Sequence, residues 1–299
     1  MGNNKRVNAI IFLAVTAIMW SLGGLLIKSV NAHPLAISGT RSAISCLIIL
    51  LYVKKPKFNW SFPQIAAGLA YASMVTCFVA GTKLTTAANA ILLQYTAPIF
   101  VALLSAWMLK EKPKTIDWVT IAVVTGGMVL FFLESLDAKG FAGNALSLLS
   151  GVSFALFTVF MRMQKNGSPI ESVILGNAIT AVIGMPFLLT AVPDTKGWLC
   201  LIILGVVQLG IPYILFSKAI KNATALEASL ITMIEPILNP IWVILIIGEI
   251  PGIFSIIGGI IVIAAVTIRC IIVSSSRSNN EENMDEKNAA KSIATSQSL

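Results

Sequence analysis

One segment of the chain occurs twice, and this repeat constrains the fold more than any other feature of the sequence. Residues 86–111 align without a gap with residues 224–249, 138 positions later. Shared alanine, leucine and isoleucine mean little in an apolar chain. The two copies also share a central proline and a terminal glutamate: Pro98 and Pro236, Glu111 and Glu249. Such a fixed-period repeat predicts two structurally related halves.

Apolar stretches fill most of the chain. It is 57% hydrophobic and 11% charged, with a mean hydropathy of +0.87, whereas soluble domains carry about 25% charged residues. About 20 mostly apolar residues are needed to cross a bilayer as a helix. Ten stretches of the chain fit this requirement: residues 7–27, 35–53, 62–82, 87–109, 116–133, 143–163, 170–191, 198–217, 225–247 and 251–272. Only helices and closed barrels satisfy the backbone in lipid, and no stretch alternates like a barrel strand. The sequence therefore predicts an all-α integral membrane protein with ten transmembrane helices.

The basic residues indicate the orientation of these helices. With the N-terminus in the cytoplasm, thirteen lysines and arginines near the helix ends lie inside. Only four lie outside: Lys28, Lys83, Lys139 and Lys196. This is the bias that the positive-inside rule expects. The net charge of +8 is thus a signal of topology and not of nucleic-acid binding. We expect a multi-pass protein of the cell (cytoplasmic) membrane with both termini in the cytoplasm.

The ten stretches divide into two sets of five. We call residues 1–137 the first half and residues 138–272 the second half, and we expect the polar residues 273–299 to be a disordered cytoplasmic tail. Because five is an odd number, the second half enters the membrane from the opposite side. Such inverted repeats are typical of secondary transporters, in which one central site faces each side in turn.

A family resemblance rests on a small set of residues in both halves. They are Pro98 within Gln94-Tyr95-Thr96-Ala97-Pro98, followed by Glu111; Glu235-Pro236, followed by Gly248-Glu249; and Arg41 early in the second helix. Over residues 7–272 the chain resembles the drug/metabolite transporter superfamily, specifically the ten-helix permeases built from two EamA repeats. The resemblance implies peripheral fifth and tenth helices, a central cavity lined by the others, and export or exchange of small metabolites. Lys110 departs from the family pattern, in which a glycine commonly precedes the glutamate that ends the fourth helix.

Glu235 is the one acidic residue deep in a predicted helix. Ten residues at 1.5 Å rise place it about 15 Å into a ~30 Å hydrocarbon core, where an ionised group costs roughly 2.5–3.5 kcal/mol. It belongs to a polar stripe with Ser229, Thr232 and Asn239. Glu235 could bind an amino or cationic group of a substrate, or carry a coupling proton, since desolvation favours the neutral carboxyl. Alternatively, it could form a structural ion pair with Arg41 or a solitary hydrogen bond.

Other polar and aromatic side chains within the predicted helices are candidates for substrate binding. With Glu235, the set is Arg41, Gln94, Tyr95, Trp20, Asn89, Asn239, Thr232 and Asn177, and Gln208 and Tyr213 are weaker candidates. Arg41 suits a planar carboxylate, but an ion pair or snorkelling toward the outer interface would also explain it. Trp20 could simply pack, and Asn177 could bond between helices. Asn89 and Gln94 lie ~140° apart on a helix and cannot both point straight inward.

Pro98 and Pro236 interrupt predicted helices at matching positions. Each removes a backbone donor and can kink its helix. They could be paired hinges of a rocking motion, or fixed bends that packing requires. Glu227 lies within a turn of the cytoplasmic surface, so we expect it to be solvated.

The residue inventory argues against an enzyme. The single histidine, His33, lies in a short loop, and we find no Ser-His-Asp set, phosphate-binding loop, metal motif or cofactor motif. The prediction is a permease that moves small-molecule substrates, amino acids or related compounds in particular, across a lipid bilayer. The expected direction is export, driven by coupling to protons or by exchange with another solute. The alternatives are multidrug or cationic-compound efflux and a non-transporting membrane scaffold; the sequence assigns no oligomeric state.

Overall fold

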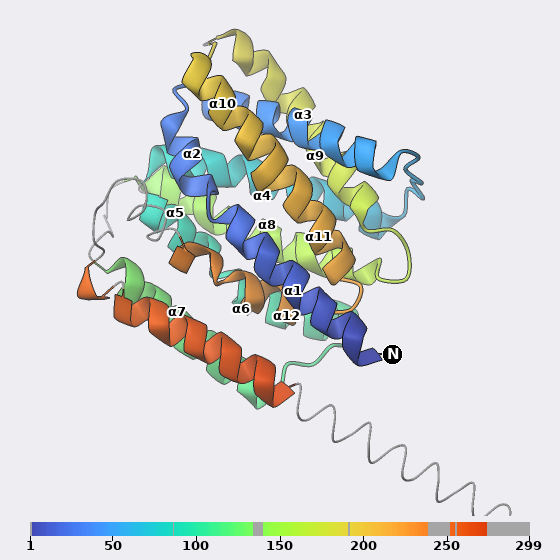
Figure 1. The fold of residues 1–299 in the computed structure, drawn as a ribbon, viewed down its shortest axis with the longest axis vertical. Coiled ribbons are helices and arrows are strands. Elements are labelled where there is room, and N and C mark those ends of the chain that lie inside the picture. The colour runs from blue at the N-terminus through green and yellow to red at the C-terminus, as the bar shows by residue number, and fades with distance from the viewer. Residues whose placement is uncertain are drawn as a thin grey trace, which may run out of the picture.

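The computed structural model describes residues 2–85, 87–133, 140–190, 192–238, 252–254 and 256–273. These residues form a bundle of helices (Figure 1), and no strand occurs among them. The helices of the first half are α1 (Gly2–Trp20), α2 (Gly23–Ser29), α3 (Pro34–Val53), α4 (Phe62–Leu84), α5 (Ala87–Gln94), α6 (Ala97–Leu104), the π-helix η1 (Ser105–Leu109) and α7 (Thr115–Phe132).

The second half repeats this order. Its helices are α8 (Phe141–Met163), α9 (Ile170–Gly184), the 3₁₀ turn η2 (Met185–Leu189), α10 (Thr195–Ile203), the π-helix η3 (Leu204–Gly210), α11 (Ile211–Ala219), α12 (Ala225–Thr232) and residues 256–273. Among the described residues, eight continuous helical segments are long and apolar enough to cross a membrane, and residues 115–131 form a shorter apolar helix. The remaining predicted span, 225–247, is described only as far as residue 238. The predicted all-helical membrane architecture is confirmed.

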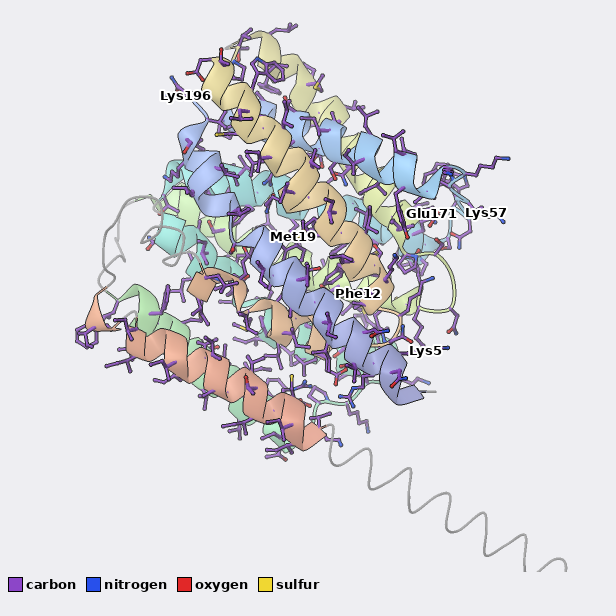
Figure 2. All side chains as sticks on the ribbon, viewed as in Figure 1. Lys5, Phe12, Met19, Lys57, Glu171 and Lys196 are labelled. Carbon is purple, nitrogen blue, oxygen red and sulfur yellow. The ribbon has the colours of Figure 1, made fainter. Side chains whose placement is uncertain are left out.

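Apolar side chains cover the outside of the bundle. Val182 is 75% exposed and Leu189 is 87% exposed, as expected for side chains that face lipid. Charged side chains gather at the helix ends: Lys5 and Lys57 lie toward one end of the bundle and Lys196 toward the other (Figure 2). The surface therefore has the apolar belt and charged ends of a membrane-spanning protein.

The two halves pack against each other along their length. The third helix of each half contacts the first helix of the other, as α4 with α8 and α11 with α1, and the second helices α3 and α9 contact each other. By contrast, α7 and residues 256–273 lie side by side along one edge of the bundle (Figure 1), where Gly127 and Gly258 bring the backbones together. The contact between the two halves is therefore made mainly by helices that precede α7 in the first half and residues 256–273 in the second.

Both copies of the internal repeat are broken helices. The first breaks at Tyr95 and Thr96, between α5 and α6, and the second breaks at the matching positions Met233 and Ile234, after α12. Pro98 and Pro236 follow the breaks by two residues, and each leaves the carbonyl four residues earlier without its helical donor. The sequence pattern thus produces paired interruptions near the middle of two spans, whereas a role of the prolines as hinges stays a prediction.

Close approach between the halves depends on glycine at Gly184. A Cβ atom there would lie 2.2 Å from the Leu35 carbonyl oxygen and 2.6 Å from the Gly39 Cα. We expect Gly184→Ala to destabilise the protein by about 1–3 kcal/mol through overpacking, seen as a lower melting temperature in detergent. Gly126→Ala is the matched control, because nothing lies within 4 Å of a Cβ at that position. Equal melting temperatures for the two variants would contradict this prediction.

Candidate functional site

A central cavity lies between the two halves of the bundle. The space in it that protein atoms do not occupy is about 480 Å³, and this figure includes space open to solvent. Both halves contribute, and the lining residues are Trp20, Arg41, Met74, Val75, Phe78, Gln94, Tyr95, Phe154, Gln208, Leu209, Tyr213 and Glu235. The wall is largely apolar and aromatic with a few converging polar groups, which is the usual composition of a small-molecule site.

The break in each repeat copy delivers one polar residue to this cavity. Tyr95 lies in the first break, and Glu235 directly follows the second. The Tyr95 hydroxyl donates a hydrogen bond to Glu235 Oε2 and also lies 3.2 Å from the Thr232 carbonyl oxygen. That carbonyl is the one that Pro236 leaves without a helical donor. The two interrupted helices are therefore joined at their breaks through a single tyrosine hydroxyl.

Arg41 is a buried cation in the wall of the cavity. It is 1% exposed, and its Nη1 donates to Gln208 Oε1 at 3.0 Å and its Nη2 to the Val75 carbonyl oxygen at 3.5 Å. Within the described part of the chain, Nε has no hydrogen-bond partner and no acidic side chain pairs with the guanidinium. The structural ion pair between Arg41 and Glu235, considered above as an alternative, is therefore absent among the described residues.

Trp20 combines packing with an unsatisfied donor. Its ring lies 5.1 Å from the Tyr213 ring and 5.9 Å from the Phe154 ring, in an edge-on contact with the latter. The indole Nε1 is buried and has no hydrogen-bond partner among the residues that the structure describes. A buried donor without an acceptor costs about 1–3 kcal/mol. Trp20 and Arg41 thus each hold a buried N–H group without a partner among the described residues, and both residues line the same cavity.

Gln94 also lines the cavity but is tied to the second half. Its Nε2 donates to Ser150 Oγ at 2.8 Å, and that hydroxyl donates to the Met74 carbonyl oxygen at 2.9 Å. Gln94 therefore has a defined orientation, with its Oε1 left as the side-chain acceptor that can serve a solute.

Three of the other predicted site residues do not line the cavity. Asn177 accepts a hydrogen bond from the Tyr71 hydroxyl, at 3.1 Å, and so joins α9 to α4. Asn89 donates to Asn144 at 3.2 Å, and the Thr232 hydroxyl donates within its own helix. Asn239 lies outside the described residues. Interhelical bonding, the alternative stated above for Asn177, describes the observed contacts of both asparagines.

Sequence reasoning missed the apolar part of the wall. Met74, Val75, Phe78 and Leu209 carry no signal in helices that are apolar on every side. Gln208 and Tyr213, the weaker candidates, do line the cavity, and Gln208 lies four residues before Pro212, in the position whose carbonyl that proline leaves free. A polar residue placed four before a mid-helix proline is the signal that could have raised its rank.

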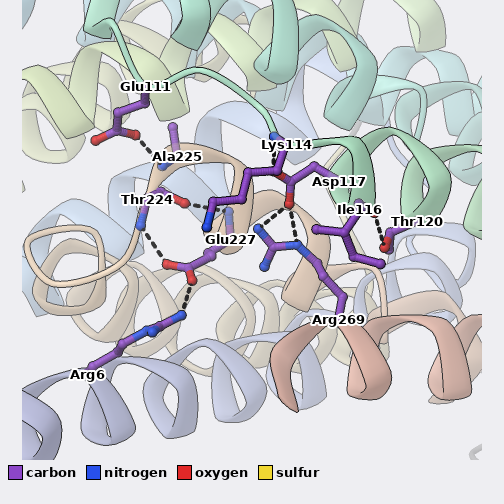
Figure 3. A network of polar contacts seen from close by, with 10 residues as sticks. All are labelled: Arg6, Glu111, Lys114, Ile116, Asp117, Thr120, Thr224, Ala225, Glu227 and Arg269. Carbon is purple, nitrogen blue, oxygen red and sulfur yellow. Dashed lines mark hydrogen bonds and ion pairs between the residues drawn. The ribbon is translucent and has the colours of Figure 1, made fainter. Parts of the chain in front are cut away.

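The expectation that Glu227 is solvated is wrong. Glu227 is 6% exposed and forms an ion pair with Arg6 (Figure 3). The reason is that the N-terminal end of α1 packs across the start of α12, a contact between distant parts of the chain that local sequence does not reveal. Among the described residues, no three or more His, Cys, Asp or Glu side chains gather in a way that could hold a metal ion.

Comparison with known proteins agrees with this architecture. The model of the EamA-like transporter family matches the chain twice, over residues 7–133 and 141–269. The pseudopaline exporter CntI of Pseudomonas aeruginosa is 28% identical, covering 88% of this chain and 95% of its own. The uncharacterized transporter YwfM of Bacillus subtilis is 24% identical, covering 80% and 86%. A crystal structure at 17% identity shares the fold, with a TM-score of 0.77 over 89% of this chain and 98% of its own. The chain therefore belongs to the EamA-like transporter family.

Proposed function

We propose that this protein is a secondary transporter that moves small metabolites bearing amino and carboxylate groups, amino acids or related compounds, across the cytoplasmic membrane by alternating access. In this proposal transport is export, coupled to protons or to exchange. The pseudopaline exporter among the relatives supports the direction. The polar residues at the helix ends support an orientation in which Lys5 and Lys57 face the cytoplasm.

One observation carries the proposed substrate class: the central cavity is lined by a buried cation without an acidic partner, Arg41, and a half-buried acid without a basic partner, Glu235. This statement refers to the described residues. Buried charges are costly unless they are paired. A zwitterionic solute supplies both missing partners at once: its carboxylate suits the guanidinium and the Trp20 N–H, and its ammonium suits Glu235. Binding such a solute would thus satisfy groups that are unsatisfied without it.

The hydrogen bonds of Tyr95 suit a proton-coupling role for Glu235. The tyrosine hydroxyl has one hydrogen and two acceptors, Glu235 and the Thr232 carbonyl. When Glu235 is ionised, that hydrogen is drawn to the carboxylate. When Glu235 is protonated, the carboxyl no longer needs the donor, and the hydrogen is available to the carbonyl. Proton binding would therefore change how the two broken helices are joined.

The aromatic wall favours a second candidate, efflux of organic cations. Trp20, Phe154 and Tyr213 surround the same cavity as Glu235, and aromatic faces attract cations. In that case Arg41 would have no role in recognition. The scaffold interpretation rests on residues 274–299, which lie outside the described residues.

A ligand panel tests the proposal directly. The melting temperature of the purified protein in detergent is measured with amino acids, organic cations and nucleosides. We expect amino acids or close relatives to raise it, because a ligand at a hundred times its dissociation constant stabilises by ~2.7 kcal/mol. The Gly126→Ala variant, changed far from the cavity lining, should respond like the unmodified protein. A response to cations alone would favour the efflux alternative, and no response to any class would contradict the proposal.

A further inference from the structure

The ion pairs of the described residues all join the first half to the second. They are Arg6 with Glu227, Arg162 with Glu111, and Arg269 with Asp117. The last of these links α7 to residues 256–273 at the edge of the bundle. The first two meet at the start of α12, where Glu111 also accepts a hydrogen bond from the Ala225 backbone N–H at 3.3 Å. Figure 3 shows Glu111, Ala225, Glu227 and Arg6 grouped at this end.

Local structure holds the Glu227 carboxylate ready for its partner. Thr224 and Glu227 form a capping box: the Thr224 N–H donates to Glu227 Oε2 at 2.9 Å, and the Glu227 N–H donates to Thr224 Oγ1 at 3.1 Å. Glu227 Oε1 then accepts from Arg6 Nη2. The two side chains are 7% and 11% exposed, so water screens this pair less than an ordinary surface pair. We call Arg6 and Glu227 the ionic pair.

The opposite end of the bundle carries a matching contact without charge. The internal repeat aligns Glu227 with Asn89. Asn89 Nδ2 donates to Asn144 Oδ1 at 3.2 Å. Asn144 lies near the start of α8, the first helix of the second half, just as Arg6 lies near the start of α1, the first helix of the first half. We call Asn89 and Asn144 the neutral pair.

The two pairs lie at opposite ends of the membrane span. Arg162, in the last turn of α8, contacts Glu111 beside the ionic pair, whereas Asn144 lies in the first turn of the same helix. Eighteen residues at 1.5 Å rise separate Asn144 from Arg162 by about 27 Å. The same repeat position therefore makes the same kind of contact between halves at each end, and only one of the two contacts is charged.

We propose that the ionic pair and the neutral pair are the two latches of alternating access, and that their difference in charge makes the end at Asn89 open more readily than the end at Glu227. The inference rests on the proposed transport function. Both latches are formed in this structure. A charge-assisted contact is stronger than a neutral one, so the two open states are unequally populated. Arg6, Glu227, Asn89 and Asn144 are thus positioning residues that contact no substrate.

Hydrogen exchange of backbone amides, measured by mass spectrometry on the purified full chain, tests this inference. Arg6→Gln removes the charge and leaves the capping box intact. We expect exchange in residues 225–232 to rise roughly fivefold, the upper end for one ion pair, and exchange in residues 89–94 at the far end to fall. Asn89→Leu removes the amide that donates to Asn144 Oδ1 and so releases the other latch. It should accelerate exchange in residues 89–94 while slowing it in residues 225–232.

The effect at the far end distinguishes a latch of alternating access from a pair that only stabilises its own surroundings. A pair with only a structural role would change exchange near the substitution and leave amides about 27 Å away unaffected. The control is Glu171→Gln, which removes a carboxylate charge that faces the Lys57 backbone N–H and belongs to neither latch, and it should produce no opposed change at the two ends. Unchanged exchange at the far end in both Arg6→Gln and Asn89→Leu would overturn the inference.

The measurement needs no substrate, so it separates the latch from the proposed transport. Opposed changes in a protein that moves none of the tested solutes would support the latches and refute the proposed substrate class. A protein that transports amino acids but shows no change at the far end would retain its proposed function without these latches.

Discussion

Glu235→Gln is expected to abolish transport driven by a pH gradient in proteoliposomes while leaving the protein folded. Glutamine has nearly the same shape and can still accept the hydrogen bond of the Tyr95 hydroxyl, but it cannot bind and release a proton. In addition, removing a half-buried acid that has no basic partner among the described residues should not lower the melting temperature. The loss would therefore be one of coupling and not of structure.

The measurement is uptake or efflux of the solute identified by the ligand panel, with and without an imposed pH gradient. Glu171→Gln is the matched control, because Glu171 is a buried acid, 2% exposed, that contacts the Lys57 backbone N–H and does not line the cavity. The control should keep its response to the gradient. If Glu235→Gln also responded to the pH gradient, Glu235 would not be the proton carrier. If the variant in addition bound the solute with unchanged affinity, Glu235 would not take part in substrate binding either.

Arg41→Gln is expected to weaken binding of carboxylate-bearing solutes by roughly 10- to 100-fold. Hydrogen bonds to charged groups contribute about 1.5–3 kcal/mol, and each 1.4 kcal/mol is a factor of ten in the dissociation constant. The guanidinium of Arg41 has no acidic partner among the described residues, so its removal breaks no ion pair that supports the fold. Calorimetric titration of the purified variant gives the dissociation constant.

Two comparisons make this prediction specific. An amine that lacks the carboxylate should bind the unmodified protein and Arg41→Gln with the same affinity, because it never contacts the guanidinium. Arg41→Lys keeps the charge but loses the planar fork of the guanidinium. Its affinity for the amino acid should therefore lie between those of the unmodified protein and Arg41→Gln. Equal losses for the amine and the amino acid would show that Arg41 supports the shape of the cavity and does not recognise a carboxylate.

Much of the architecture could be predicted from the sequence because its signals are local. Lipid solubility depends on the summed hydropathy of about 20 consecutive residues, and the helical state follows from the need to satisfy the backbone in lipid. A mid-helix proline breaks the backbone pattern where it stands, so Pro98 and Pro236 marked two interruptions that the structure contains. The depth of Glu235 likewise follows from counting residues along a helix.

The site was less predictable because the rotation of each helix is not written in its sequence. A helix that is apolar all round gives no sign of which face turns inward. Asn89 and Gln94 were therefore equal candidates, although only Gln94 lines the cavity. In the same way, the sequence allows an ion pair between Arg41 and Glu235. The packing of α3 instead directs the guanidinium to Gln208 on the π-helix η3.

The sequence by itself determined the membrane-spanning helices, the internal repeat and the depth of Glu235, since each depends on spacing along one chain segment. Only the tertiary structure decided which groups from distant segments meet. It brought Tyr95 to Glu235 and left Arg41 without an acidic partner among the described residues. It also turned Glu227 from an expected surface residue into one member of a buried contact between the halves. Such contacts depend on how helices rotate and cross, and that is set by the fit of all their side chains together.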